Sequence, residues 1–247
     1  MLKALIGTEY QWRFFIIFEL PLCITYIEIC MSHQFTTDDS QLLSDIMRLR
    51  RDVRGNHFLP TPVDDSVIDQ LLEAALHAPS VGYSQPWQFV VVRDEAIKRQ
   101  VHQCFTAANT AGKAQFSSEK QQQYSKLKLE GILEAPVNLA VFYQNQAPPV
   151  LGQTSMPDMG RFSVVCAIQN LWLMARSLNI GVGWVSIVDP EAVKQAVNAP
   201  ATSELIGYLC IGYVDEFLDE PELKTAGWAK QKHKQDVVYH NSFNPAE

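Results

Sequence analysis

The chain has 247 residues, of which 47% are hydrophobic, so it can bury one substantial core and we expect a single domain of helices and strands. The net charge of -7 argues against a protein that binds duplex nucleic acid, because such a protein needs surplus Lys and Arg to replace the phosphate counterions. Any anionic ligand must therefore be held by a local cluster of basic side chains.

The cysteines and histidines give no sign of a metal or redox site. The five cysteines are odd in number and far apart, without C-x-x-C spacing; they are Cys23, Cys30, Cys104, Cys166 and Cys210. We expect buried thiols in a reducing cytoplasm. The six histidines form neither an H-E-x-x-H nor an H-x-H arrangement, and we expect no metal.

Residues 1–30 are strongly apolar and have features of a signal peptide or membrane anchor. Glu19 and Glu28 interrupt the run, so no stretch reaches the roughly 18 uncharged residues that a membrane span requires. No small-residue cleavage site precedes Met31, which opens an ordinary polar start. We therefore expect residues 1–30 to be a non-native extension from an over-long gene assignment, residues 31–247 to form the domain, and no membrane contact. A true anchor is the alternative.

The first predicted helix covers residues 36–47, where polar capping residues precede apolar positions at helical spacing. It leads into a basic cluster at residues 48–54. Asp64 or Asp65 caps a second helix, which Pro79 stops. The two helices therefore flank the basic cluster.

The middle of the chain alternates strands with helices. Residues 88–93 form a short β-type run, and the helix that follows has one apolar face made of Ile97, Val101, Cys104 and Phe105. Residues 109–126 are polar, small and rich in Gln, which suits an exposed lid better than a core element. We expect a helix through residues 124–132 and the next strand at residues 137–143.

The next part begins with a loop at residues 144–158, which contains three prolines. The longest apolar helix covers residues 162–178, and Asn179 and Gly181 can end it in left-handed geometry. Residues 182–187 are strand-like, with glycine where another group must approach the backbone closely.

The last predicted elements are a short helix and a strand. Asp189 supplies a helix cap and is followed by a proline and an acid in the first turn. Residues 205–213 form the final strand, and the charged tail from Val214 onward is expected to wrap over the body or over a partner. The chain shows no internal repeat and no linker that would split it.

Arg50, Arg51 and Arg54 are the first candidate site. Three arginines within five positions exceed what a helix end needs, since one or two cations satisfy the helix dipole. A solvated basic face is the plain alternative. A phosphate dianion fits better, because guanidinium groups pair with it bidentately and keep their charge.

Two further stretches carry residues that local structure alone does not require. In residues 78–87 a helix stop and a polar turn precede a strand, and Gln85 and Trp87 at the exit are more than a turn needs. Residues 181–186 form a strand after a glycine-relieved turn, which alone is a weak signal.

These three stretches, in this order, resemble the nitroreductase superfamily over about residues 41–228. The similarity is closer to its 5,6-dimethylbenzimidazole synthase branch. The stretches that carry this closer resemblance are residues 50–55, 127–132, 165–173, 181–187 and 219–223, the last followed by Gly227-Trp228.

The resemblance implies an α+β, nitroreductase-like fold, in which a mixed, mainly antiparallel sheet is flanked by helices in an intertwined homodimer. FMN would bind at the subunit interface. The flavin-binding residues that the resemblance implies are Arg50, Arg51, Asp52, Val53, Arg54, Ser80, Gln85, Trp184, Val185 and Ser186.

The resemblance also divides these residues by their place around the flavin. The three arginines would contact the phosphate, the ribityl chain and the pyrimidine edge. Ser80 and Gln85 would lie on a turn next to the flavin. Residues 184–186 would lie on the strand beside the ring, near its reactive N5 and C4a edge.

Asp52 departs from ordinary nitroreductases, which usually carry Ser at this position. A serine only forms hydrogen bonds, whereas a carboxylate can also accept a proton as a general base. An anion beside a phosphate ester and a reduced flavin needs a partner, and the neighbouring arginines can supply one. A salt bridge that merely holds an arginine is the plain alternative, and the branch resemblance favours the catalytic interpretation.

In the resembling branch, reduced FMN is a substrate that reacts with O2 and is fragmented to 5,6-dimethylbenzimidazole, the lower ligand of cobalamin and related cobamides, and erythrose 4-phosphate. Asp52 would transfer a proton at the ribityl-derived carbon, and Ser186 would hydrogen-bond to the peroxyflavin or to the N5 edge. A lid at residues 106–130 would exclude bulk water.

Two alternatives are open. A conventional NAD(P)H-dependent nitroreductase or dehalogenase would recycle its FMN, and an idle flavin-binding or storage protein would hold FMN without turnover. The reduced FMN could come from a separate flavin reductase or from NAD(P)H used by the protein itself.

Overall fold

The computed structural model describes residues 15–16, 27–28, 34–145 and 149–243. The expectation for residues 1–30 lies outside the described residues, apart from the backbone of β1 (Phe15–Ile16) and β2 (Ile27–Glu28), which pair antiparallel. The chain divides into two compact units, Met1–Leu43 and Ser44–Glu247. Among the described residues, no helix is long and apolar enough to cross a membrane.

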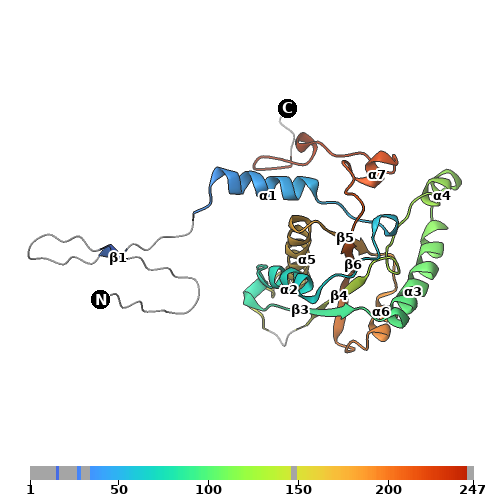
Figure 1. Cartoon of the computed structure of the whole chain (residues 1–247), viewed down its shortest axis with the longest axis horizontal. Coiled ribbons are helices and arrows are strands. Elements are labelled where there is room, and N and C mark those ends of the chain that lie inside the picture. Colours follow the sequence, from blue (N-terminus) through green and yellow to red (C-terminus); the bar gives the residue numbers. More distant parts are fainter. Residues whose placement is uncertain (1–14, 17–26, 29–33, 146–148, 244–247) are drawn as a thin grey trace, which may run out of the picture. The chain divides into compact units, whose positions relative to one another are not determined.

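The second unit is built on a four-stranded antiparallel sheet with the strand order β3-β4-β6-β5 (Figure 1). Its strands are β3 (Trp87–Val92), β4 (Val137–Gln144), β5 (Ile180–Val185) and β6 (Ser203–Tyr213). Each overlaps a strand predicted from the sequence, although β5 ends two residues earlier than expected. An isolated parallel bridge joins Asp52 to Val182 on β5, which lies at one edge of the sheet.

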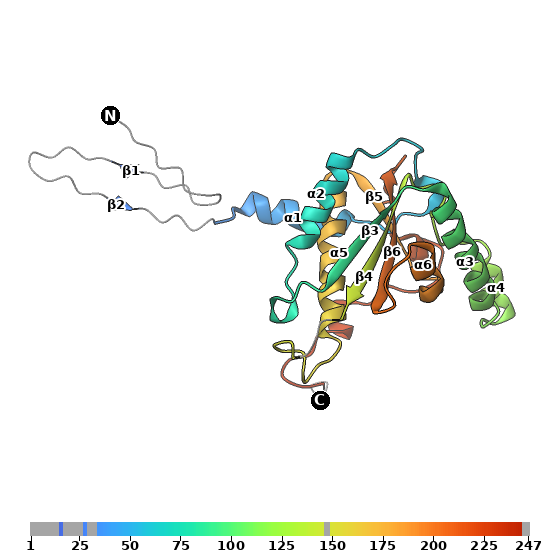
Figure 2. The ribbon, with the colours of Figure 1, turned by 90° about the horizontal axis from the view of Figure 1, so that it is seen from below.

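Helices cover both faces of this sheet. α2 (Asp65–Leu76) and α5 (Met159–Ser177) pack together on one face, and α3 (Glu95–Lys113) and α6 (Pro190–Ala196) lie on the other (Figure 2). The central strand β4 serves both, since Leu139 and Val141 belong to the α2 and α5 core while Ala140 and Phe142 belong to the opposite one. Successive side chains of a strand point to opposite faces, so this strand reads as a continuous apolar run.

The remaining helices are α1 (Thr37–Leu49), α4 (Ser118–Tyr124) and α7 (Glu222–Thr225), with 3-10 turns at Gly55–His57, Val81–Tyr83 and Lys234–Asp236. The predicted cap of α6 is confirmed, because the Asp189 carboxylate accepts the N–H groups of Glu191 and Ala192 at 2.8 and 3.0 Å. Asn179 ends α5 with φ +56°, as expected. Gly181 does not take part in this ending, because it lies within β5.

The helix predicted through residues 124–132 is wrong beyond Tyr124, where α4 ends. The backbone here bonds to a distant segment instead of to itself: the Glu130 carbonyl accepts the Gly55 N–H at 2.8 Å. Gly131 packs under Phe58, whose ring would lie only 2.7 Å from a Cβ at that position. These long-range contacts outweigh the local helical pattern.

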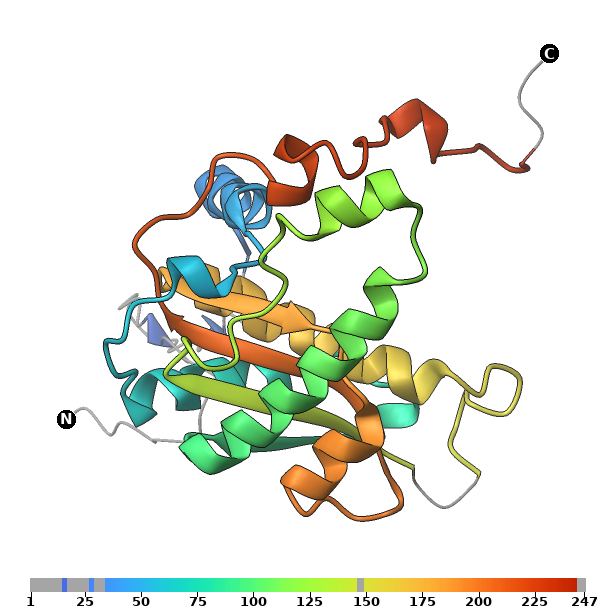
Figure 3. The same cartoon turned by 90° about the vertical axis from the view of Figure 1, so that its right-hand side faces the viewer.

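The tail after β6 wraps over the body of the second unit. This is one of the two arrangements expected from the sequence, the other being contact with a partner. The tail passes the predicted lid, residues 106–130 (Figure 3). There Trp228 packs against Phe116 and Tyr124, with ring centroids 5.3 and 6.0 Å apart. Lys120 on α4 lies 4.4 Å from the centre of the Trp228 ring. The predicted lid is thus helical in its α3 and α4 parts, is not helical beyond Tyr124, and contacts the tail.

The expectation of buried cysteines holds for one of the three that the structure describes. Cys210 on β6 is buried, Cys104 on α3 is half-buried, and Cys166 on α5 is exposed. Cys23 and Cys30 lie outside the described residues.

Candidate active site

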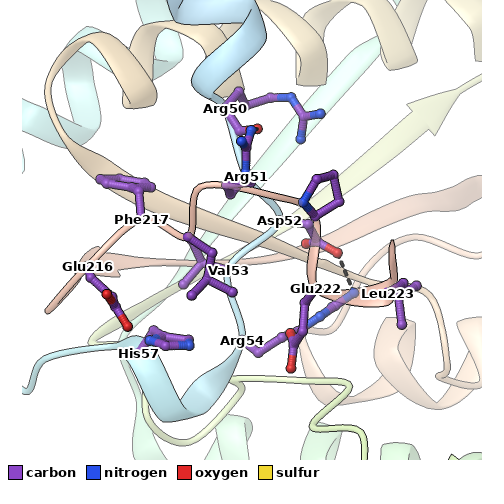
Figure 4. A pocket seen from close by; sticks show the side chains of 12 residues that line it. Arg50, Arg51, Asp52, Val53, Arg54, His57, Glu216, Phe217, Glu222 and Leu223 are labelled. Atoms are coloured by element: carbon purple, nitrogen blue, oxygen red, sulfur yellow. Dashed lines mark hydrogen bonds and ion pairs between the residues drawn. The ribbon is translucent and has the colours of Figure 1, made fainter. Parts of the chain in front are cut away.

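A cleft of about 150 Å³ lies between the segment after α1 and the first part of the tail (Figure 4). The basic cluster forms one wall and the tail forms the other. The residues that line the cleft are Arg50, Arg51, Asp52, Val53, Arg54, His57, Glu216, Phe217, Leu218, Pro221, Glu222 and Leu223.

Close backbone packing on β5 fixes the position of this cluster. The Val53 N–H donates to the Val182 carbonyl at 3.0 Å. The Val53 carbonyl in turn lies where a Cβ of residue 183 would stand, so that Gly183 cannot be replaced without moving it. The expectation that another group approaches this glycine-containing strand is confirmed, and the approaching group is the backbone of the arginine cluster.

Asp52 is anchored at both carboxylate oxygens. Its Oδ1 accepts the backbone N–H of Trp184 at 2.9 Å, and its Oδ2 forms an ion pair with Arg54. Burial raises the pKa of Asp52, and the Arg54 cation, the Trp184 N–H and the Arg50 cation oppose part of that rise. The side chain still exposes 34% of its surface, so the carboxylate is held in place yet reachable from the cleft.

The three arginines have different surroundings. Arg54 is 12% exposed and also donates to the Leu129 carbonyl at 3.3 Å. Arg51 donates to the carbonyls of Arg48 and Arg50 at 2.8 Å and to that of Asp219, and so ties the cluster to the tail. Its hydrogen bonds are therefore structural.

Arg50 is the arginine best placed to receive an anion. Its guanidinium stacks on Trp172 of α5, 4.8 Å from the ring centre. Burial lowers the pKa of Arg50, although Asp52 opposes this. In the part of the chain that the structure describes, this guanidinium has no carboxylate or carbonyl within bonding distance. An anion in the cleft would supply one.

Residues 184–186 lie next to the cluster, outside the cleft wall. Trp184 and Val185 end β5, and the Trp184 ring packs against Gly207, where a Cβ would lie 3.0 Å away. Ser186 follows the strand and is exposed. The structure therefore brings this predicted part of the site to Asp52 through the Trp184 N–H.

Ser80 and Gln85 lie elsewhere in the chain. They belong to a turn that packs on the first part of α5, where the Val81 N–H donates to Ser163 Oγ at 3.1 Å. Ser80 Oγ accepts the Gln85 N–H at 3.1 Å, and Gln85 has φ +46°. Trp172, which meets Arg50, is nine residues further along α5, about 13 Å at the helical rise. A single chain therefore does not bring this turn to the cleft.

Sequence reasoning missed the tail side of the cleft. His57 Nδ1 lies 3.0 Å from Asp215 Oδ1, and this hydrogen bond lowers the pKa of Asp215. Phe217 packs under the Arg176 guanidinium, 4.1 Å from its ring centre. The signal that could have found this wall is the 219–223 stretch, which carried part of the branch resemblance without being assigned a place in the site.

The sequence pattern of the nitroreductase family matches residues 47–213. The chain belongs to the nitroreductase family. It is 45% identical to the 5,6-dimethylbenzimidazole synthase of Rhodospirillum rubrum over 77% of this chain and 90% of that protein. It is 43% identical to the 5,6-dimethylbenzimidazole synthase of Rhodobacter capsulatus over 75% of this chain and 90% of that protein.

A solved structure of oxidized iodotyrosine deiodinase, bound to FMN and 3-iodo-L-tyrosine, superposes on the chain with a TM-score of 0.63. That match has 25% sequence identity and covers 81% of this chain and 100% of the deiodinase chain. Both the nitroreductase-like α+β fold and the resemblance to the 5,6-dimethylbenzimidazole synthase branch are confirmed. The homodimer and the individual site residues stay predictions.

Proposed function

We propose that this chain is a 5,6-dimethylbenzimidazole synthase that uses reduced FMN and O2 as substrates and releases 5,6-dimethylbenzimidazole and erythrose 4-phosphate. The similarity to two synthases supports the activity. The observation that carries the chemistry is Asp52, a carboxylate with a raised pKa that faces a cleft lined by arginines. A general base needs a pKa near the working pH and a fixed position. The pKa of Asp52 is raised in that direction, and contacts with Trp184 and Arg54 fix its carboxylate.

The donor set of the cleft fits a flavin mononucleotide. Arg50 supplies a cation for an anionic group, and Arg54 keeps positive charge beside the place where a reduced pyrimidine would carry negative charge. Reduced FMN, when bound, supplies the carbon skeleton that is oxidised by O2. The chain's own residues orient it, balance its charge and hold the base at the atom that loses a proton.

Ser186 is the second residue for which we propose a role in the reaction. Its hydroxyl is exposed directly after the strand that holds Asp52 through Trp184. A hydroxyl at this place can donate a hydrogen bond to the N5 edge of the flavin ring. That bond would favour formation of 5,6-dimethylbenzimidazole over the competing reaction, in which O2 only reoxidises the flavin and is released as hydrogen peroxide.

A homodimer completes this site. The cleft of about 150 Å³ is small beside the roughly 300 Å³ or more of ordinary cofactor pockets. The Ser80 turn, which we propose as part of the flavin site, is remote from the cleft within one chain. α5 exposes Phe162, Val165 and Met174 along its length, Leu178 is exposed directly after it, and a second copy would bury them.

The test is mass spectrometry of the products after the purified protein is mixed with chemically reduced FMN in air. We expect 5,6-dimethylbenzimidazole in amounts that exceed a protein-free control. Intact FMN as the sole flavin product, with NAD(P)H consumed when an electron acceptor is added, would instead identify a recycling nitroreductase or dehalogenase. Bound FMN with neither reaction would identify a storage protein.

A further inference from the structure

Residues 127–134, which lead from α4 to β4, form a support behind the Asp52–Arg54 pair. The Leu129 carbonyl accepts Arg54 Nη1 at 3.3 Å, and the next carbonyl, that of Glu130, accepts the Gly55 N–H at 2.8 Å. Two consecutive carbonyls of this segment therefore bind Arg54, the last residue of the arginine cluster, and Gly55, which follows it. Any shift of residues 129–130 is passed directly to Arg54.

Three charged side chains, those of Lys128, Glu130 and Glu134, are joined within this segment. Lys128 forms ion pairs with Glu130 and with Glu134, the latter at 2.6 Å. The Glu130 side chain is only 4% exposed, and its second oxygen accepts the Ile132 N–H at 2.7 Å. A Cβ at Gly55 would lie 2.7 Å from Glu134 Cδ, so the network packs directly against the cluster.

This arrangement is costly for a structural turn alone. A buried carboxylate needs a cation and hydrogen bonds to offset its desolvation, and well-packed apolar side chains commonly stabilise a fold as well or better. The charges do have a use here. Lys128 and Glu130 form an ion pair on either side of Leu129, and the Leu129 carbonyl and the Asp52 carboxylate both contact the Arg54 guanidinium.

We propose that Glu130 and Lys128 are positioning residues, which hold Arg54 against Asp52 through the Leu129 carbonyl. This inference rests on the proposed function, because it assigns Asp52 the role of base. Asp52 faces the cations of Arg50 and Arg54 and the Trp184 N–H, and Glu222 lines the same cleft. When Arg54 is released from its carbonyl, it pairs less well with Asp52, and the Asp52 carboxylate then binds a proton at higher pH.

The experiment compares wild type with Glu130→Gln and Lys128→Met in single turnovers of reduced FMN with O2, followed by product quantification across pH. We expect product formation to fall about 10- to 100-fold, as for a misplaced catalytic group. We expect the acid limb of the pH profile to move up by roughly half a unit or more. Affinity for oxidised FMN should stay within about three-fold, because Arg50 is untouched.

A matched control is Glu191→Gln, which removes the partner of Lys194, a buried lysine on α6 with the Glu191 carboxylate 3.0 Å away. It should leave the pH profile in place. Glu134→Gln serves if Glu130→Gln does not fold, since Glu134 is 39% exposed and tolerates neutralisation. It should shift the acid limb in the same direction by a smaller amount.

The outcomes separate this inference from the proposed function. Failure of the wild type to make 5,6-dimethylbenzimidazole contradicts the function itself. An active wild type with variants that keep its rate and pH profile contradicts the positioning role. Variants that lose rate and thermal stability in parallel, with the acid limb unmoved, show that the network only builds the turn and overturn the inference as well.

Discussion

At the scale of single residues, the two oxygens of Asp52 have different partners, and both partners oppose the effect of burial on its pKa. Burial raises its pKa above the ordinary 3.8, so ionisation is less favourable in the folded protein than in the unfolded chain. Stability from this raised pKa is present at low pH and is lost as pH rises through the folded value. Product formation has the opposite dependence, because a base must be ionised.

Asp52→Asn tests this directly. We expect FMN binding within several-fold of wild type and nearly complete loss of 5,6-dimethylbenzimidazole, because the amide keeps the shape and accepts the Trp184 N–H but cannot take a proton. Leaving Arg54 without its anion should also cost about 1–3 kcal/mol of stability. Fluorescence titration, product quantification and thermal melts measure the three effects.

The control is Asp65→Asn, which neutralises another arginine-paired carboxylate, 2.7 Å from Arg93 and outside the cleft. It should make product at the wild-type rate. If Asp52→Asn loses flavin binding as severely as product, Asp52 holds the arginines and is not the base.

Ser186→Ala should lower the yield of product per reduced FMN while returning oxidised FMN and hydrogen peroxide. The hydroxyl is exposed, so stability should change by no more than about 0.5 kcal/mol. The ratio of 5,6-dimethylbenzimidazole to oxidised FMN after one turnover measures the effect, with Ser177→Ala as the control for an exposed serine. An unchanged ratio removes Ser186 from the reaction.

The residues of the site that the sequence could reveal are those whose chemistry is local. Three arginines in five positions and the glycines of β5 are visible as excess charge and missing side chains. The position of the tail wall, by contrast, could not be predicted from local sequence, because Arg51 and Asp219 are 168 positions apart. Nothing in the composition of residues 216–223 indicates which part of the chain they face.

At the scale of elements, the same contrast between local and distant contacts separates correct from incorrect predictions. The core strands and α2, α3 and α5 were predictable because their apolar pattern coincides with their final burial, and α6 was predictable from its cap at Asp189. Residues 127–132 have an apolar spacing that also suits a helix. Their partner, Arg54, is 75 positions away from Leu129, so the competing hydrogen bonds could not be seen in a sequence window.

Trp228 is the residue through which the tail holds α4. Trp228→Ala removes the ring contacts with Phe116 and Tyr124 and the cation–π contact with Lys120. Each contact is worth about 0.5–1.5 kcal/mol. We expect backbone amides of residues 114–126 to exchange with deuterium about ten-fold faster or more, and reduced flavin to be oxidised with less product because water enters.

Tyr239→Ala is the matched change, since it removes another aromatic pair of the tail, with Phe243 at 5.1 Å. It should leave α4 exchange unaltered. Equal exchange in wild type and Trp228→Ala would mean that α4 is held by its own helix contacts, and that the tail merely lies upon it.

At the scale of the whole molecule, the proposed second copy makes a measurable difference. Val165→Glu places a charge on the exposed side of α5 and should convert a dimer to monomers that bind FMN at least about ten-fold more weakly. Light scattering at micromolar concentration and flavin titration measure both. Val91→Glu is the control, because Val91 on β3 is 39% exposed against 40% for Val165. A wild-type monomer that binds FMN tightly would refute the shared site.

Deletion of residues 1–30 should leave FMN affinity unchanged, because every residue that lines the cleft belongs to the unit Ser44–Glu247. We also expect less self-association, since the apolar residues of this segment would form an apolar patch that promotes association if exposed. Loss of flavin from the truncated chain, or recovery of the full chain in the membrane fraction of cells, would support the anchor alternative instead.

α5 separates the two parts of the proposed site, the Ser80 turn and the arginine cluster. Ser163 binds the Ser80 turn near one end of the helix, and Trp172 contacts Arg50 further along. In a symmetric pair, each site would take its arginine cluster from one chain and its turn from the other. Two defective parents then complement each other. A mixed dimer of an Asp52→Asn chain and a chain with a disabled Ser80 turn contains one site with both defects and one with neither, so co-expression should restore product that neither parent makes alone.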